Sequence, residues 1–216
     1  MTDLLPPWPV LSAFLFASLV LAITPGPGVL YIVTRSLVQG RRSGLVSVVG
    51  VALGNLGNAL AASVGLAALF AASSLAFGVV KYAGALYLFY LGVQMFRSPQ
   101  AASPAPAPLA VPLSRVLRDG FVVALLNPKT TLFFAAFLPQ FLSPEAPPML
   151  QSMALGSLFV AIATVTDCGY ALAAGMVAPA LARAASVRRL GRRLGGGVFI
   201  GLAVFTALTG SRSRAG

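Results

Sequence analysis

Residues 10–31 read VLSAFLFASLVLAITPGPGVLY, an uncharged and mostly apolar segment with a proline-glycine run near its end. The hydrocarbon core of a bilayer is about 30 Å thick and is crossed by roughly 20 helical residues, so this segment predicts a transmembrane helix. Proline removes a backbone donor, and glycine destabilises a helix by about 1 kcal/mol. The run Pro25-Gly26-Pro27 therefore predicts a break or kink inside the membrane.

The rest of the chain contains further apolar segments of similar length. Spans are predicted at residues 44–70, 75–96, 118–141 and 149–174, and a sixth begins at residue 191 or 194 and ends at residue 210. With 58% hydrophobic residues, 9% charged residues and a mean hydropathy of +0.90, the chain is too apolar for a soluble domain. We expect an all-α, polytopic membrane protein with six transmembrane helices, although Arg212 and Arg214 leave a five-span or re-entrant arrangement open.

A proline- and alanine-rich segment divides the predicted spans into two groups of three. Residues 98–112 contain five prolines, which is typical of a linker and not of a packed helix. We therefore predict repeats at residues 1–97 and 113–216, which an odd number of spans places in opposite orientations, as in many secondary transporters. Pro25 and Pro128 are 103 residues apart and Leu11 and Leu113 are 102 apart, which supports this inverted repeat.

The basic residues lie between the apolar segments and predict the orientation of the chain. They gather in the first, third and fifth loops, at Arg35, Arg41 and Arg42, at Arg97, Arg115 and Arg118, and at Arg183, Arg188, Arg189, Arg192 and Arg193. Cytoplasmic loops are enriched in Lys and Arg, so both termini should be periplasmic. The net charge of +11 is dispersed in this way and does not predict nucleic-acid binding. No basic residue precedes Arg35, so we expect no cleaved signal peptide.

The helix breaks and the buried charges mark the candidate translocation site. Backbone groups freed at Pro25-Gly26-Pro27 and at Asn127-Pro128 cannot face lipid and should line a polar cavity. Lys129 and Asp167 fall inside predicted spans, where each costs at least about 2.5 to 3.5 kcal/mol. We expect them to approach each other or to share a hydrated cavity, with Asp167 as the proton carrier. A structural kink and a structural ion pair are the alternatives.

Small polar and glycine residues on the second span have two readings. Asn55 and Asn58 are three residues apart on one helical face and suit the backbone of an amino acid, or else a hydrogen bond between helices. Gly50, Gly54 and Gly57 have a spacing that permits close helix packing, and a homodimer through glycine faces is possible.

The residue inventory argues against an enzyme. The chain has no histidine, a single cysteine (Cys168) and four acids, Asp3, Asp119, Glu145 and Asp167, which are scattered along the sequence. These residues supply neither a metal cluster nor the paired carboxylates of most intramembrane hydrolases, so we expect no metal and no cofactor. An exporter or channel for another small solute remains the alternative to amino-acid export.

An ordered set of motifs resembles the lysine exporter (LysE) and homoserine-threonine resistance (RhtB) family of amino-acid translocators. The motifs are residues 24–27 (TPGP), the glycine pattern of 44–54, 81–92 (KYAGALYLFYLG), 120–121, 126–129 (LNPK), 137–141 (FLPQF), Asp167 and 196–202 (GGVFIGL). The resemblance implies a bacterial inner-membrane exporter of amino acids or their derivatives, driven by the proton gradient. It also implies that Pro25, Gly26, Pro27, Asn127, Pro128, Lys129 and Asp167 belong to the translocation region.

Overall fold

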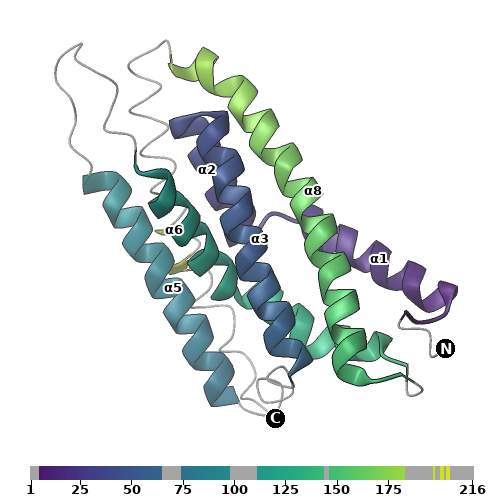
Figure 1. The fold of residues 1–216 in the computed structure, drawn as a ribbon. Helices are drawn as coiled ribbons and strands as arrows, with labels where there is room; N and C mark the ends of the chain where they lie inside the picture. The colour runs from purple at the N-terminus through teal and green to yellow at the C-terminus, as the bar shows by residue number, and fades with distance from the viewer. Residues whose placement is uncertain are drawn as a thin grey trace.

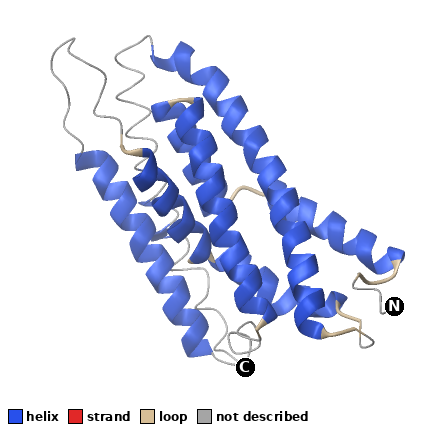
Figure 2. Cartoon of the chain, in the orientation of Figure 1, coloured by secondary structure: helices blue, strands red, loops and turns tan. Residues whose placement is uncertain are grey.

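The computed structural model describes residues 5–64, 74–97, 111–143 and 146–182, together with residues 197, 200, 201, 203 and 204. All regular secondary structure in these ranges is helical, as the sequence predicts (Figure 2). The division predicted between the second and third spans, most of the linker and most of the sixth span lie outside the described residues. The six-span count and the inverted repeat therefore stay predictions.

The first predicted span is two helices joined at the proline-glycine run. Helix α1 (Trp8–Ile23) and helix α2 (Pro27–Gln39) meet at an angle of 47°, which confirms the predicted break. Thr24 and Gly26 are extended, and Pro27 occupies the first turn of α2, where a missing backbone N–H costs nothing. In Figure 1, α1 runs away from the bundle that the other labelled helices form.

The long helices of the bundle lie at the second, third and fifth predicted spans, but the second ends at Ser63 and not at residue 70, and the fifth continues to Ala182, beyond the predicted residue 174. Helix α3 (Arg41–Ser63) follows α2 after one residue, Gly40, whose φ of 81° allows the sharp reversal. Helix α5 covers Ser74–Arg97 and helix α8 covers Pro148–Ala182. By length and composition, Arg41–Ser63 and Pro148–Ala178 can each cross a membrane, and the bent pair α1–α2 is a third crossing if its two helices form one span.

The fourth predicted span is also broken, but it begins earlier than predicted. Helix α6 (Leu113–Leu125) ends at Leu126 and Asn127, and helix α7 (Pro128–Leu132) continues into a π-helical turn (Phe133–Phe137) and a 3-10 turn (Leu138–Phe141). The break before Pro128 confirms the prediction. The start at Leu113 corrects it, because Arg115 and Arg118 lie on the helix and not in the preceding loop. The apolar pattern placed the boundary at the last charge, whereas α6 carries its charges in its first turns.

One end of the bundle gathers the basic residues. Helices α2 and α5 end there, and helices α3 and α6 begin there (Figure 1). We call it the basic end, and its described arginines are Arg35, Arg41, Arg42, Arg97, Arg115 and Arg118. The arrangement is the one that the loop charges predict.

Helices α3 and α6 pack backbone against backbone through glycines. A Cβ atom added at Gly50 would lie 2.3 Å from the carbonyl oxygen of Leu117, and one at Gly54 would lie 2.4 Å from that of Phe121. One at Gly57 would lie 3.0 Å from a methyl carbon of Leu125. This glycine face therefore packs inside the chain, so it is not available to a second copy.

Replacement of Gly54 by alanine is expected to destabilise the protein. The new methyl group would press on backbone atoms of α6, and overpacking of this kind costs about 1–3 kcal/mol. Each kcal/mol lowers the Tm of a chain of this size by roughly 2–4 °C, which is measurable on protein purified in detergent. The control is Gly169→Ala on α8, where nothing lies within 4 Å of the added Cβ. An unchanged Tm for Gly54→Ala would contradict the close packing.

Candidate functional site

A small cavity lies where the two broken helices meet α3 and α8. Its volume of about 40 Å³ is room for a few water molecules. The lining residues come from α1, α2 and the turn between them, from α3, from α7 and the turn before it, and from α8. They are Leu21, Ala22, Gly26, Gly28, Val29, Val51, Asn55, Asn127, Lys129, Thr130, Phe159, Ala163 and Asp167.

The structure brings five of the predicted site residues to this cavity. They are Gly26, Asn55, Asn127, Lys129 and Asp167. The other four, Pro25, Pro27, Asn58 and Pro128, are not among its lining residues. The three prolines belong to the breaks that allow α1, α2 and α7 to meet here, so their effect on the cavity is through backbone shape.

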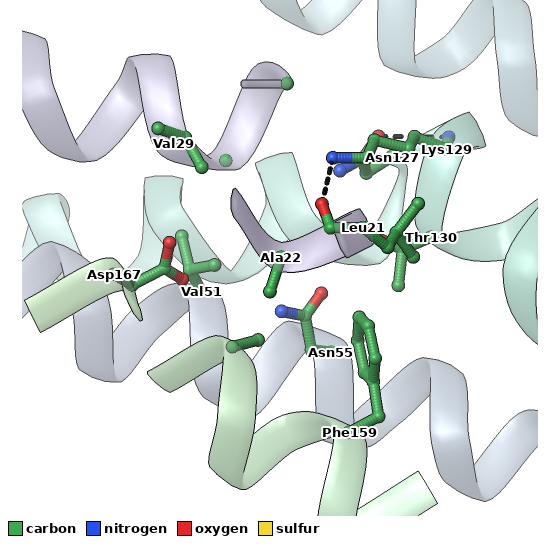
Figure 3. Close-up of a pocket in the computed structure, with 13 residues that line it drawn as sticks. Leu21, Ala22, Val29, Val51, Asn55, Asn127, Lys129, Thr130, Phe159 and Asp167 are labelled. Carbon is green, nitrogen blue, oxygen red and sulfur yellow. Dashed lines mark hydrogen bonds between the residues drawn. The ribbon is translucent and has the colours of Figure 1, made fainter. Parts of the chain in front are cut away.

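Lys129 binds the free end of α1. Its Nζ donates a hydrogen bond to the carbonyl oxygen of Leu21 at 2.7 Å (Figure 3). It donates a second hydrogen bond to the carbonyl oxygen of Thr24. The hydroxyl of Tyr170 donates to the neighbouring carbonyl oxygen of Ile23 at 2.7 Å. Carbonyls in the last turn of a helix have no partner within that helix, so these side chains satisfy groups that the break leaves open. Asn127 supports Lys129 by accepting a hydrogen bond from its backbone N–H at 3.1 Å.

Asp167 faces the same cavity from α8. Its side chain is only 5% exposed, and within the described part of the chain it has no hydrogen bond and no ion pair within 4 Å. Lys129 lies across the cavity from it (Figure 3). The two opposite charges thus share a cavity without touching, which is one of the two arrangements that the sequence predicts. The space between them is available to a third charged group.

The two asparagines of α3 have different environments. Asn55 is 6% exposed and lines the cavity, and its Oδ1 has no hydrogen-bond partner among the described residues. Asn58 donates from Nδ2 to the carbonyl oxygen of Ala124 on α6 at 2.9 Å. Asn58 therefore joins two helices, whereas Asn55 lies on the cavity wall with a buried acceptor that no described residue satisfies.

One face of α8 forms an extended wall of the cavity. Phe159, Ala163 and Asp167 follow one another at intervals of four residues, so they lie in a row along the helix. Sequence reasoning singled out only the acid. The interval of four residues was the available signal that Phe159 and Ala163 line the same cavity as Asp167.

Packed side chains lie on both sides of the cavity. Toward the basic end is a cluster that contains Tyr31, Ile32, Val48, Val51, Val123, Ala124 and Ala171. Toward the other end is an aromatic cluster in which the rings of Phe133 and Phe159 are 4.8 Å apart and Phe14 is fully buried. Packed side chains therefore bound the cavity toward both ends of the bundle, and an occupant larger than a few water molecules requires it to widen. No group of three or more His, Cys, Asp or Glu residues that could hold a metal occurs in the described ranges.

Comparisons with known proteins agree with a transport protein. A homoserine/homoserine lactone efflux protein of Salmonella typhimurium is 34% identical over 166 residues, which are 77% of this chain and 81% of that protein. A membrane protein of Vibrio cholerae without an assigned function is 28% identical over 90% of this chain and 95% of its own length. A leucine efflux protein of Salmonella choleraesuis is 29% identical over 62% of this chain and 64% of that protein.

A family model also matches most of the chain. No solved structure matches the chain significantly. The model of the LysE type translocators matches residues 19–210, a range that includes both helix breaks, Lys129 and Asp167. With its apolar helices and this match over most of its length, the chain belongs to the LysE type translocator family of membrane proteins.

Proposed function

We propose that this protein exports small amino acids, or derivatives of them, with uncharged side chains across the bacterial inner membrane in exchange for protons. The observation that carries the proposal is the pair of opposite charges, Lys129 and Asp167, on one cavity beside two broken helices. A zwitterion matches such a cavity because it neutralises both charges. The similarity to homoserine and leucine efflux proteins supports an amino acid of this kind.

The open polar groups suggest how the substrate lies. Its ammonium group would bind the carboxylate of Asp167 and the free Oδ1 of Asn55, both of which are acceptors. Its carboxylate would lie near Nζ of Lys129, which has three donors and uses two of them on α1. Gly28 and Val29, in the first turn of α2, also line the cavity, and the positive end of the helix dipole there would favour a negative group.

Proton exchange would use the same carboxylate. Asp167 carries one charge that either a proton or the substrate ammonium neutralises, so the two compete for it. Loading from the basic end, which we assign to the cytoplasm, and release on the other side would then return a proton inward. Both termini would face the periplasm in the six-span arrangement.

A transport assay tests the function directly. Cells that overproduce the protein are loaded with dipeptides, and the efflux of the released amino acids is followed over a panel of neutral, acidic and basic side chains. We expect saturable efflux of small neutral amino acids that responds to the proton gradient. Flux that does not saturate and ignores the gradient would indicate a channel, and no flux of any amino acid would refute the proposal.

The wall of α8 is expected to determine which side chains fit. With the ammonium at Asp167, the substrate side chain would extend along the row toward Ala163 and Phe159. Ala163→Leu fills this space, so the efflux of leucine should fall about tenfold relative to that of alanine, since a methylene misfit in an apolar pocket costs about 1–3 kcal/mol. Val165→Leu, on the same helix but 73% exposed, is the matched control. Equal losses for both substrates would argue against this orientation.

A further inference from the structure

Asp119 is a buried acid that the proposed transport site does not use. Its side chain is 2% exposed, and it accepts hydrogen bonds from Arg35 at 3.3 Å and from the hydroxyl of Tyr87 at 3.0 Å. Arg115 and Arg118 approach it at 3.9 and 3.8 Å. We call these five residues the Asp119 cluster. It connects α2 and α5, from the first half of the chain, to α6 in the second half.

The cluster lies between the cavity and the basic end. Along α2, Val29 lines the cavity, Tyr31 follows, and Arg35 comes six residues after Val29, which is about 9 Å along the helix. Along α6, Asp119 precedes Asn127 of the cavity by eight residues, or about 12 Å. Along α2 and α6, the cluster therefore lies at a level between the cavity and the basic end.

Tyr31 fills the space between the two sites. It is fully buried, its hydroxyl donates to the carbonyl oxygen of Val116 at 2.8 Å, and the guanidinium of Arg35 lies 5.2 Å from the centre of its ring. A change in the position of Arg35 would thus move Tyr31 as well, because both belong to α2. The ion pair between Arg35 and Asp119 and the ring of Tyr31 are therefore coupled through α2.

Helix α2 has a point of bending at each end. At its start, the run from Thr24 to Gly26 interrupts the helix and leaves a bend of 47°. At its end, Gly40 has a φ of 81° and has nothing within 4 Å of an added Cβ. A helix of 13 residues with a break on either side can tilt without unfolding its neighbours.

We propose that the Asp119 cluster is a gate that closes the cavity on the side of the basic end, and that tilting of α2 opens it. An ion pair suits a reversible seal, because water can solvate both charges when they separate, whereas the apolar contacts between α3 and α6 regain nothing from water. This inference goes beyond the proposed function. It rests on that function only for the reason why the gate opens, which is to let the amino acid pass. The gate itself is testable without any substrate.

The test measures access to the cavity with a thiol reagent. The single cysteine is removed by Cys168→Ser, and Thr130→Cys places a thiol of similar size on the cavity wall. The labelling rate with a membrane-impermeant methanethiosulfonate is measured in right-side-out and in everted vesicles. We expect Asp119→Asn to raise the rate at least tenfold in one vesicle orientation and not in the other, and Arg35→Gln to have a similar effect.

Two variants and one double variant make the result decisive. Arg118→Gln, which alters a 70% exposed side chain of the cluster, should change the rate less than twofold. The double variant that combines Arg35→Gln and Asp119→Asn should label no faster than either single variant, because both substitutions remove the same ion pair. If Asp119→Asn does not reach the membrane, Tyr87→Phe decides, since it keeps every charge, removes one hydrogen bond and should raise the rate a few-fold.

The contrary outcomes are equally clear. Equal acceleration in both vesicle orientations would show general loosening and overturn the gate, and so would unchanged rates in both Asp119→Asn and Tyr87→Phe. One-sided acceleration in a protein that exports no amino acid would leave the gate standing and refute the proposed function instead. Normal export together with unchanged labelling rates would refute the gate and leave the proposed function standing.

Discussion

Replacement of Asp167 by asparagine is expected to abolish amino-acid export and to leave the chain in the membrane. The amide has nearly the same shape as the carboxylate, but it has no charge for the substrate ammonium and no site for a transported proton. Loss of a buried charged contact costs about 2–5 kcal/mol, which corresponds to a reduction of roughly 30-fold to 4,000-fold. The measurement is the efflux from dipeptide-loaded cells at equal amounts of membrane-inserted protein.

The neighbour of Asp167 provides the control. Cys168 is partly buried and packs against the cluster around Tyr31, so Cys168→Ser changes the same turn of α8 without touching the cavity charge. We expect this variant to export at close to the normal rate. Normal export by the Asp167→Asn variant would refute the roles of Asp167 in both substrate binding and proton exchange.

Replacement of Lys129 by methionine is expected to reduce export at least tenfold and to destabilise the protein. Methionine keeps most of the apolar stem, but it cannot donate to the carbonyl oxygens of Leu21 and Thr24 at the end of α1. It also leaves Asp167 as the sole charge on the cavity. We expect the Tm of the purified protein to fall by roughly 5 °C, as for the loss of one to two kcal/mol in a chain of this length.

A double variant separates these two effects of Lys129. If the charge of Lys129 compensates that of Asp167, then adding Asp167→Asn to Lys129→Met removes the uncompensated charge and should recover part of the lost Tm. Export should stay absent, because the substrate then finds neither charge. A double variant that is less stable than either single variant would show that Lys129 acts only as the cap of α1 and that its charge is unrelated to Asp167.

Local chemistry was enough to predict the breaks and the polar character of the site. Proline and glycine disturb a helix wherever they occur, so the interruptions at Pro25-Gly26-Pro27 and before Pro128 follow from the sequence. Buried charges are costly in a membrane, so Lys129 and Asp167 had to face an interior space. These inferences depend on composition within a few residues and not on how the helices pack.

The hydrogen-bond partners that depend on helix packing could not be predicted from the sequence in this way. Asn55 and Asn58 lie on one face of α3, and only the approach of α6 decides that Asn58 bonds to Ala124 while Asn55 stays open. The hydrogen-bond partners of Lys129 are backbone carbonyl oxygens. Every residue has such an oxygen, so no pattern of side chains in the sequence predicts which ones Lys129 binds. The Asp119 cluster was missed because Arg115 and Arg118 were assigned to a loop. Their spacing of four and one residues from Asp119 on a helix was the available signal.

The seam between α3 and α6 has a consequence for how the molecule can cycle. Its two helices come from opposite sides of the proline-rich linker, and their backbones touch at Gly50 and Gly54 with no side chain between them. Helices packed this closely do not shift past each other, so the two halves of the sequence do not move as two separate rigid bodies. We therefore expect α3 and α6, one helix from each half, to stay together during the proposed transport cycle, and the movements to occur in the short helices α2 and α7 beside the proline breaks.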